Sequence, residues 1–109
     1  MAAGAILADW GADVIKVEHP VRGDTQRGFL NMGGVKLDPL RHTLIEHPNR
    51  GKRSITLELD KPEGQAVVRA IAVRSDIVLE NFKAGTLKRF GLDYDSLKAV
   101  NPGIIYCSI

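Results

Sequence analysis

Amide, aromatic and basic side chains of this 109-residue chain gather directly beside short apolar segments. Residues 12–20 end in a polar turn, residues 49–57 carry a basic run, and the third block contains Asn81, Phe82 and Lys83. In an open α/β sheet, ligands bind in the crevice outside the carboxyl ends of the strands, so residues placed there are stronger functional candidates than residues within strands. The chain therefore points to a binding site, and its basic side chains favour an anionic ligand.

The elements that must position these side chains follow from the spacing of the apolar residues. Residues 2–10 are rich in helix formers and end before Gly11, while a second helix begins at Asp60 with a proline and an acid in its first turn. The predicted helices are 2–10, the helix from residue 60, 86–91 and 93–100, and the predicted strands are 14–17, 54–59, 77–79 and 104–109. This alternation predicts a Rossmann-like α/β fold, a parallel sheet with right-handed crossovers and flanking helices.

The segment from His19 to Pro48 is rich in glycine and proline and shows no sustained periodicity. Such a pattern predicts a long loop, which is a candidate flap over the site. Within it, the pair Asp24 and Arg27, each beside a glycine, fits either a ligand flap or a turn held by contact between the two side chains.

Composition and charge bound the class of protein. The chain is 44% hydrophobic and 26% charged, which is typical of a soluble globular protein of one domain at most. A net charge of +2 is too balanced for binding that neutralises nucleic-acid phosphates, so we expect no nucleic-acid partner. No apolar run approaches the length of a membrane span and no secretory leader is visible, so we expect no membrane partner.

The single cysteine, Cys107, follows apolar residues in the last predicted strand and is expected to be buried. It has no internal disulfide partner, which favours a reducing, cytoplasmic compartment. Trp10 lies at helical spacing from Ile6 and is expected in the core. Both ends are expected to be truncated, because the first helix lacks a preceding strand to pack on and the chain finishes inside a strand.

Two further groups of polar residues can be interpreted as ordinary surface residues. His42 and His47 lie near Glu46, but no cysteine or further histidine completes a ligand set, so we expect surface residues and no metal site. The basic run Arg50, Lys52 and Arg53 fits a solvated charge cluster at a strand edge as well as it fits ligand contacts.

Short motifs recur at a specific spacing over nearly the whole chain. They are LADWGADVIKVE at 7–18, GD at 23–24 with RG at 27–28, GKRSI at 51–55, PEG at 62–64, SDIVLENF at 75–82, GL at 91–92, and NP at 101–102 with IY at 105–106. Together they resemble the family III CoA-transferases, which include formyl-CoA transferase, carnitine CoA-transferase and α-methylacyl-CoA racemase. The resemblance implies that residues 1–109 are part of the N-terminal, CoA-binding large domain of a longer enzyme, which forms an interlocked homodimer.

The resemblance also implies that coenzyme A is bound as a substrate and that no metal takes part. The adenine, diphosphate and 3′-phosphate of CoA require apolar contacts, backbone N–H groups and basic side chains. By the resemblance, the CoA-binding positions are His19, Leu57, Asn81, Phe82, Lys83 and Arg89. His19 stands where characterised transferases carry a basic residue, and Asp60 stands where some carry a lysine. Without the resemblance, Asn81 could simply cap a turn and Phe82 could belong to the core.

The implied reaction moves CoA between an acyl-CoA and a small carboxylic acid. In the family an aspartate attacks the thioester to give a mixed anhydride, and the CoA thiolate then forms an enzyme-bound thioester. That aspartate lies downstream of Ile109, so no catalytic residue is assigned here and the segment alone is expected to be inactive. Two alternatives remain open. One is an acyl-CoA racemase of the same fold, in which acid and base residues replace the nucleophile. The other is a non-catalytic CoA- or nucleotide-binding fragment, which His19 and Asp60 favour.

Overall fold

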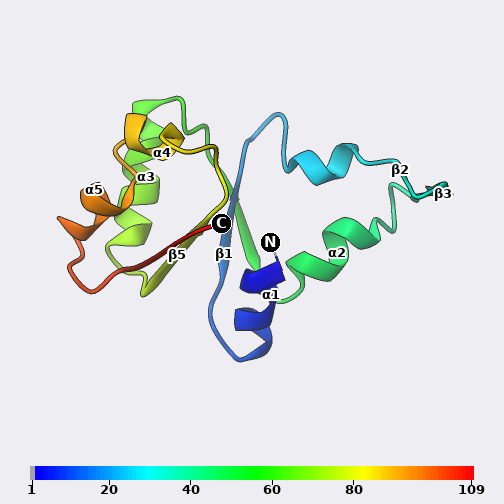
Figure 1. Cartoon of the computed structure of the whole chain (residues 1–109), viewed down its shortest axis with the longest axis horizontal. Helices are drawn as coiled ribbons and strands as arrows, with labels where there is room; N and C mark the ends of the chain where they lie inside the picture. Colours follow the sequence, from blue (N-terminus) through cyan, green and yellow to red (C-terminus); the bar gives the residue numbers. More distant parts are fainter. Residues whose placement is uncertain (1) are drawn as a thin grey trace. The chain divides into compact units, whose positions relative to one another are not determined.

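The computed structural model describes residues 2–109 and divides the chain into two compact units, Met1–Leu57 and Glu58–Ile109. Each unit contains one pair of parallel strands with helices beside it (Figure 1). The predicted parallel α/β fold with flanking helices is confirmed. No helix formed by residues 2–109 is long and apolar enough to span a bilayer.

The first unit is built on strands β1 (Ile15–Glu18) and β4 (Arg53–Thr56). They pair in parallel, from Ile15 opposite Arg53 to Glu18 opposite Thr56. Helix α1 (Ala2–Asp9) precedes β1 and packs against helix α2 (Thr43–Asn49). Gly11 follows α1 with a φ of +94°, a left-handed conformation that lets the chain reverse after the helix.

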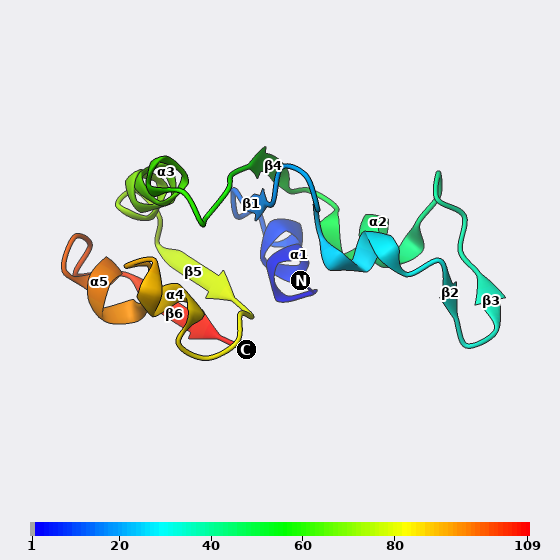
Figure 2. The same ribbon diagram turned by 90° about the horizontal axis from the view of Figure 1, so that it is seen from above.

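The segment between β1 and β4 is more regular than the sequence predicted. It contains a 3-10 helix (Thr25–Gly28), the short antiparallel strands β2 (Asn31–Met32) and β3 (Val35–Lys36), and α2 (Figure 2). Gly33 and Gly34, both at positive φ, form the two-residue turn of this hairpin. The prediction of an unstructured loop was wrong because these elements are too short to show a period, and Pro48 lies within α2.

The second unit has all its helices on one face of its strand pair. Strands β5 (Ile77–Glu80) and β6 (Ile105–Ser108) pair in parallel, with Val78 opposite Tyr106. Helices α3 (Pro62–Ala72), α4 (Thr86–Arg89) and α5 (Tyr94–Lys98) supply the buried core residues Ala72, Leu87 and Leu97, against which Val78 and Tyr106 pack. Ile77, Leu79 and Ile105 are exposed on the opposite face. This unit therefore has two layers.

Helix boundaries in the second unit follow the predictions to within a residue or two. Helix α3 starts with Pro62 at its first position, so Lys61 rather than Asp60 occupies the cap position. Gly85, with φ of +81°, occupies the cap position of α4, and Thr86 is the first helical residue, as in the predicted helix 86–91. Asn101 follows α5, and its side-chain amide donates to the carbonyl oxygens of Ala72 (3.0 Å) and Ser75 (2.8 Å).

Two burial predictions were wrong. Trp10 was expected in the core because of its helical spacing from Ile6, but Trp10 is 81% exposed and Ile6 is 47% exposed. Cys107 is exposed as a free thiol on β6. In both cases the sequence pattern identified an apolar face, but nothing among the described residues covers it.

Candidate functional site

The loop after β5 carries most of the predicted site residues. Asn81, Phe82 and Lys83 follow the last residue of the strand directly, and all three are exposed. Phe82 is 47% exposed, so its alternative role as a core residue is wrong. Within residues 2–109, the side chains of Asn81 and Lys83 make no hydrogen bond or ion pair. Their amide and ammonium groups are therefore available to a ligand.

The carboxylate of Glu80 holds this loop in place. One carboxylate oxygen, Oε2, accepts the backbone N–H of Phe82 at 2.8 Å. The other, Oε1, accepts the hydroxyl of Ser108, which lies opposite Glu80 in the β5–β6 register. At the far end of the loop, the N–H of Thr86 donates to the carbonyl oxygen of Lys83 at 3.0 Å.

A pocket of about 290 Å³ opens beside this loop. Phe82 and Lys83 line it together with Lys88 from α4, and aromatic residues Tyr94 and Tyr106 contribute ring surface. Burial raises the pKa of Tyr106 to about 12, with a further contribution from the carboxylates of Glu80 and Asp93, so the phenol stays neutral at pH 7. Its hydroxyl donates to the carbonyl oxygen of Leu92 at 3.2 Å.

The sequence prediction missed the supporting residues of this pocket. Glu80, Tyr106 and Ser108 lie on the helix-covered face of β5 and β6, a face that the two-residue period of a strand identifies once the register is known. Lys88 was not predicted, because the family resemblance assigned its neighbour Arg89 and not Lys88 to CoA binding. Arg89 is the last residue of α4, is exposed, and has its guanidinium 5.8 Å from the ring centroid of Phe90.

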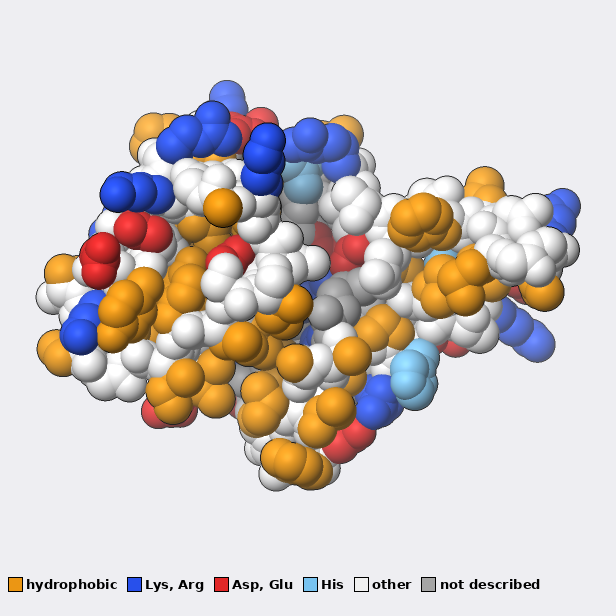
Figure 3. All heavy atoms as spheres, in the orientation of Figure 1, with side chains coloured by type: hydrophobic (Ala, Val, Ile, Leu, Met, Phe, Trp, Pro, Cys, Tyr) orange, Lys and Arg blue, Asp and Glu red, His pale blue; other side chains and the backbone are white. Residues whose placement is uncertain are grey.

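The surface of the second unit is basic near this site. Lys and Arg side chains gather over α3 and α4 on the face drawn in Figure 3. Lys83, Lys88 and Arg89 all belong to the loop and helix that follow β5, and all are exposed. A cluster of exposed cations around an aromatic ring and a pocket suits a ligand that has both phosphate groups and an apolar ring.

The remaining predicted site residues, His19 and Leu57, lie together in the first unit. Each directly follows a strand end, because Glu18 and Thr56 are the last paired residues of β1 and β4. The N–H of Leu57 donates to the carbonyl oxygen of Glu18 at 2.9 Å. Both side chains are half-buried, and both residues stand at the carboxyl edge of the β1–β4 pair.

His19 closes a tight turn. Its ring Nδ1 accepts the backbone N–H groups of Val21 and Arg22, each at 3.1 Å. A nitrogen that accepts two hydrogen bonds carries no proton, so the neutral ring has its proton on Nε2. His19 is thus a donor toward a ligand through Nε2 only.

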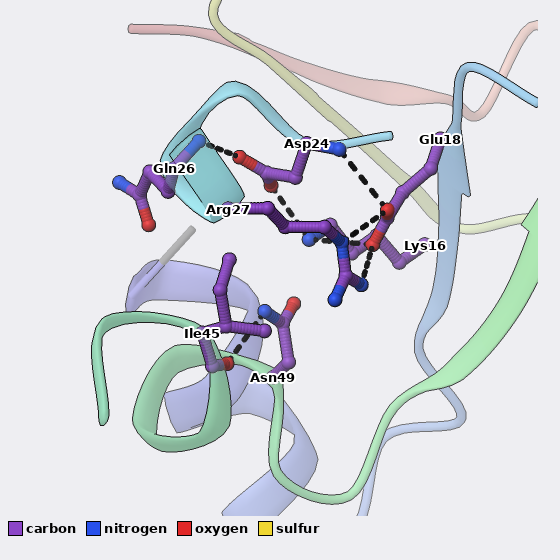
Figure 4. Close-up of polar contacts among 7 residues, drawn as sticks. All are labelled: Lys16, Glu18, Asp24, Gln26, Arg27, Ile45 and Asn49. Atoms are coloured by element: carbon purple, nitrogen blue, oxygen red, sulfur yellow. Dashed lines mark hydrogen bonds and ion pairs between the residues drawn. The ribbon is translucent and has the colours of Figure 1, made fainter. Parts of the chain in front are cut away.

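Residues on either side of this turn form a cluster of four charged side chains, Lys16, Glu18, Asp24 and Arg27 (Figure 4). Arg27 donates to both carboxylate oxygens of Glu18, at 3.1 and 3.0 Å, and Lys16 lies 3.0 Å from Glu18 and 2.6 Å from Asp24. These contacts, chiefly the Arg27 hydrogen bonds, lower the pKa of Glu18 from 4.5 to about 2.

The cluster tests the turn interpretation of the Asp24–Arg27 pair, while the ligand-flap interpretation stays a prediction. The segment forms a turn held by ion pairs, but the expected contact between the two side chains is wrong. Arg27 binds Glu18, while Asp24 binds Lys16 and accepts the N–H of Gln26 at 2.9 Å.

The basic run at the start of β4 makes contacts mainly within the protein itself. Arg50 forms an ion pair with Asp9, and Arg53 forms one with Asp13, all with exposed side chains. The interpretation as a surface charge cluster is confirmed for these two arginines. Burial, followed by repulsion from Lys16, lowers the pKa of Lys52, which lies close to Gly4 of α1.

The histidines of the first unit show a different outcome from the one expected. His42 is buried, and its Nε2 lies 2.8 Å from the carbonyl oxygen of Phe29, so the prediction of a surface residue was wrong for His42. His47 is exposed. Residues 2–109 contain no group of three or more His, Cys, Asp or Glu side chains arranged to hold a metal ion.

Known proteins are similar to this chain in sequence and in fold. Residues 1–109 match CoA-transferase family III, so the chain belongs to that family. It is 49% identical over 98% of its length to the succinate–glutarate CoA-transferase of Agrobacterium fabrum. It is also 43% identical over 95% of its length to a formyl-CoA:oxalate CoA-transferase of Rhodopseudomonas palustris.

A solved structure supports the fold. The crystal structure of a CAIB/BAIF family protein from Brucella suis superposes with a TM-score of 0.84 at 45% identity, over 98% of this chain and 28% of that one. The chain spans about a quarter of the length of these relatives, 27% of the Agrobacterium protein and 24% of the Rhodopseudomonas protein.

Proposed function

We propose that residues 1–109 are the N-terminal, CoA-binding part of the large domain of a longer CoA-transferase, which moves coenzyme A between small carboxylic acids. The observation that carries this proposal is the loop after β5. It presents a free amide, an exposed ring and a free ammonium beside a pocket with basic edges, in a chain of CoA-transferase family III.

Each side chain of this loop can be matched to a part of coenzyme A. The ring of Phe82 offers an apolar face to the adenine, and the Lys83 and Arg89 side chains offer positive charge to phosphate groups. Asn81 offers an amide that can both donate and accept a hydrogen bond. By the family resemblance, His19 and Leu57 are also proposed CoA positions, and they offer a donor and an apolar side chain at the ends of β1 and β4 in the first unit.

The proposed reaction uses an aspartyl intermediate whose aspartate lies outside this chain. The proposed substrates are an acyl-CoA and a carboxylic acid, with no metal ion, and the proposed assembly is an interlocked homodimer. Succinate, glutarate, formate and oxalate are the acids to test first, because the names of the relatives contain them. The free thiol Cys107 suits a reducing, cytoplasmic compartment.

The test is CoA binding by the protein that contains this chain, measured by calorimetry for Asn81→Ala and Arg89→Ala. Each change should weaken binding by about tenfold, because a hydrogen bond to a charged group contributes roughly 1.5 kcal/mol. Arg74→Ala is the matched control, since Arg74 is exposed and precedes the amino end of β5. Unchanged affinity in both site variants would refute the CoA-binding role.

A second measurement separates the transferase from its alternatives. Mixing succinyl-CoA with glutarate should give glutaryl-CoA if the proposal holds. Exchange of the α-hydrogen of a 2-methylacyl-CoA with solvent deuterium, without transfer, would identify the racemase instead. CoA binding with no transfer to any of the four acids and no hydrogen exchange would favour a non-catalytic module.

A further inference from the structure

The acid at the end of β5 is unexpected next to a proposed site for a polyanionic ligand. Glu80 lines the same pocket as Lys83 and Lys88, and a bare carboxylate there would repel phosphate groups. Its two oxygens are instead occupied by donors of the protein, the N–H of Phe82 and the hydroxyl of Ser108. The Glu80 carboxylate therefore binds groups of the protein itself rather than the ligand.

These two hydrogen bonds fix the start of the loop to the neighbouring strand. Ser108 is the last residue of β6, and the N–H of Ile109 also donates to the backbone carbonyl of Glu80, at 3.0 Å. The side chain and the main chain of Glu80 thus both bind the end of β6. The N–H of Phe82 is the group through which the carboxylate sets the direction of the chain as it leaves the strand.

The first unit shows the same device in a different setting. Strand β1 also ends in a glutamate, Glu18, and its Oε2 accepts the backbone N–H of Asp24 in the loop that follows, at 3.1 Å. In both units a strand-terminal carboxylate accepts a backbone N–H of the next loop, which carries the predicted ligand residues. Each of these loops thus has a backbone N–H that is bound by the carboxylate at the end of the preceding strand.

We propose that Glu80 is a positioning residue, which orders Asn81 and Phe82 for CoA by tying their loop to Ser108 of β6. The inference rests on the proposed function. Ordering the loop before the ligand arrives lowers the entropy lost on binding, so the effect of Glu80 is on affinity for CoA and not on the chemical step.

The experiment compares Glu80→Gln with Glu80→Ala in the protein that contains this chain, with the dissociation constant of CoA and the kcat and KM of transfer as readouts. Glutamine retains an oxygen that accepts the Phe82 N–H and adds an amide that can bind the Ser108 hydroxyl. We expect Glu80→Gln to bind CoA within about twofold of the parent, and Glu80→Ala to weaken binding by about tenfold, raising KM for CoA with little change in kcat.

Ser108→Ala provides a second variant that keeps the proposal testable if Glu80→Ala fails to fold. It removes one anchor of the carboxylate and should weaken CoA binding by several-fold. Equal gains in affinity for Glu80→Gln and Glu80→Ala would show a charge effect only and would overturn the proposal. So would parent-like affinity in both Glu80→Ala and Ser108→Ala.

The outcomes also separate this inference from the proposed function. If Asn81→Ala weakens CoA binding while Glu80→Ala does not, the CoA site stands and the positioning role fails. If no variant, Asn81→Ala and Arg89→Ala included, changes CoA affinity, the proposed function itself fails.

Discussion

Replacing Glu18 by glutamine should destabilise the first unit in a way that depends on pH. Glu18 is only 9% exposed, and its carboxylate is bound by Lys16, Arg27 and the N–H of Asp24. A pKa that falls from 4.5 to about 2 corresponds to roughly 3 kcal/mol of stabilisation from the charged form. Glu18→Gln should therefore lower the local free energy of unfolding by roughly 3 kcal/mol at pH 7.

The sign of the pH dependence follows from the same values. The pKa is lower in the folded state than in the unfolded state, so the stabilisation is fully present above about pH 5 and is lost as pH falls toward 2. With these two pKa values, the stabilisation from ionised Glu18 is about 1.4 kcal/mol at pH 3, which is less than half of its value at pH 7. The gap between the parent and Glu18→Gln should narrow accordingly on acidification.

Hydrogen–deuterium exchange of peptides covering β1 and β4 measures this effect locally in the whole protein. Where exchange reports the opening equilibrium, Glu18→Gln should exchange about 100-fold faster than the parent at pH 7 and about tenfold faster at pH 3. Glu63→Gln is the matched control, because Glu63 is exposed in the first turn of α3. A rate ratio that does not change between pH 7 and pH 3, or one equal to that of the control, would refute the account of Glu18.

Two further substitutions test the packing of the second unit. Gly64→Ala should lower the melting temperature, although alanine normally favours a helix by about 1 kcal/mol, because a Cβ at this position would lie 2.2 Å from the carbonyl oxygen of Glu58. Gly28→Ala, where the added Cβ meets nothing within 4 Å, should have little effect. Asn101→Ala should lower the free energy of unfolding, measured by urea titration, by roughly 1–3 kcal/mol, since the hydrogen bonds to the carbonyl oxygens of Ala72 and Ser75 are lost. A free energy of unfolding equal to that of the parent would show that these two hydrogen bonds do not stabilise the unit.

The parts of the fold that the sequence predicted are those with strong local signals. The β-branched and apolar runs located all the strands of the parallel pairs, and Gly11, Pro62 and Asp93 marked helix ends. The α2 helix was not predicted because it is short and contains Pro48, and because Ile45 is its one buried residue, so it shows no apolar stripe. Burial of Trp10 and Cys107 was mispredicted because a pattern shows which face is apolar but not whether anything covers it.

The candidate site divides in the same way. The exposed residues Asn81, Phe82 and Lys83 were predicted because they follow a strand, a position that sequence alone can identify. The groups that hold them were not predicted, since the pairing of Glu80 with Ser108 depends on a parallel register between segments 28 residues apart. Long-range register is not encoded in a local pattern.

The two glutamates that end β1 and β5 should differ in what their loss changes. Glu18 is buried with several charged partners, so its loss acts mainly on stability. Glu80 is less buried and has two neutral donors, so its loss should act mainly on loop order and leave the two-layer core of its unit intact. If Glu80 acts as proposed, the same residue type at the end of a strand stabilises the fold in the first unit and orders the proposed CoA loop in the second, and the difference lies in the charge of its partners and in its own burial.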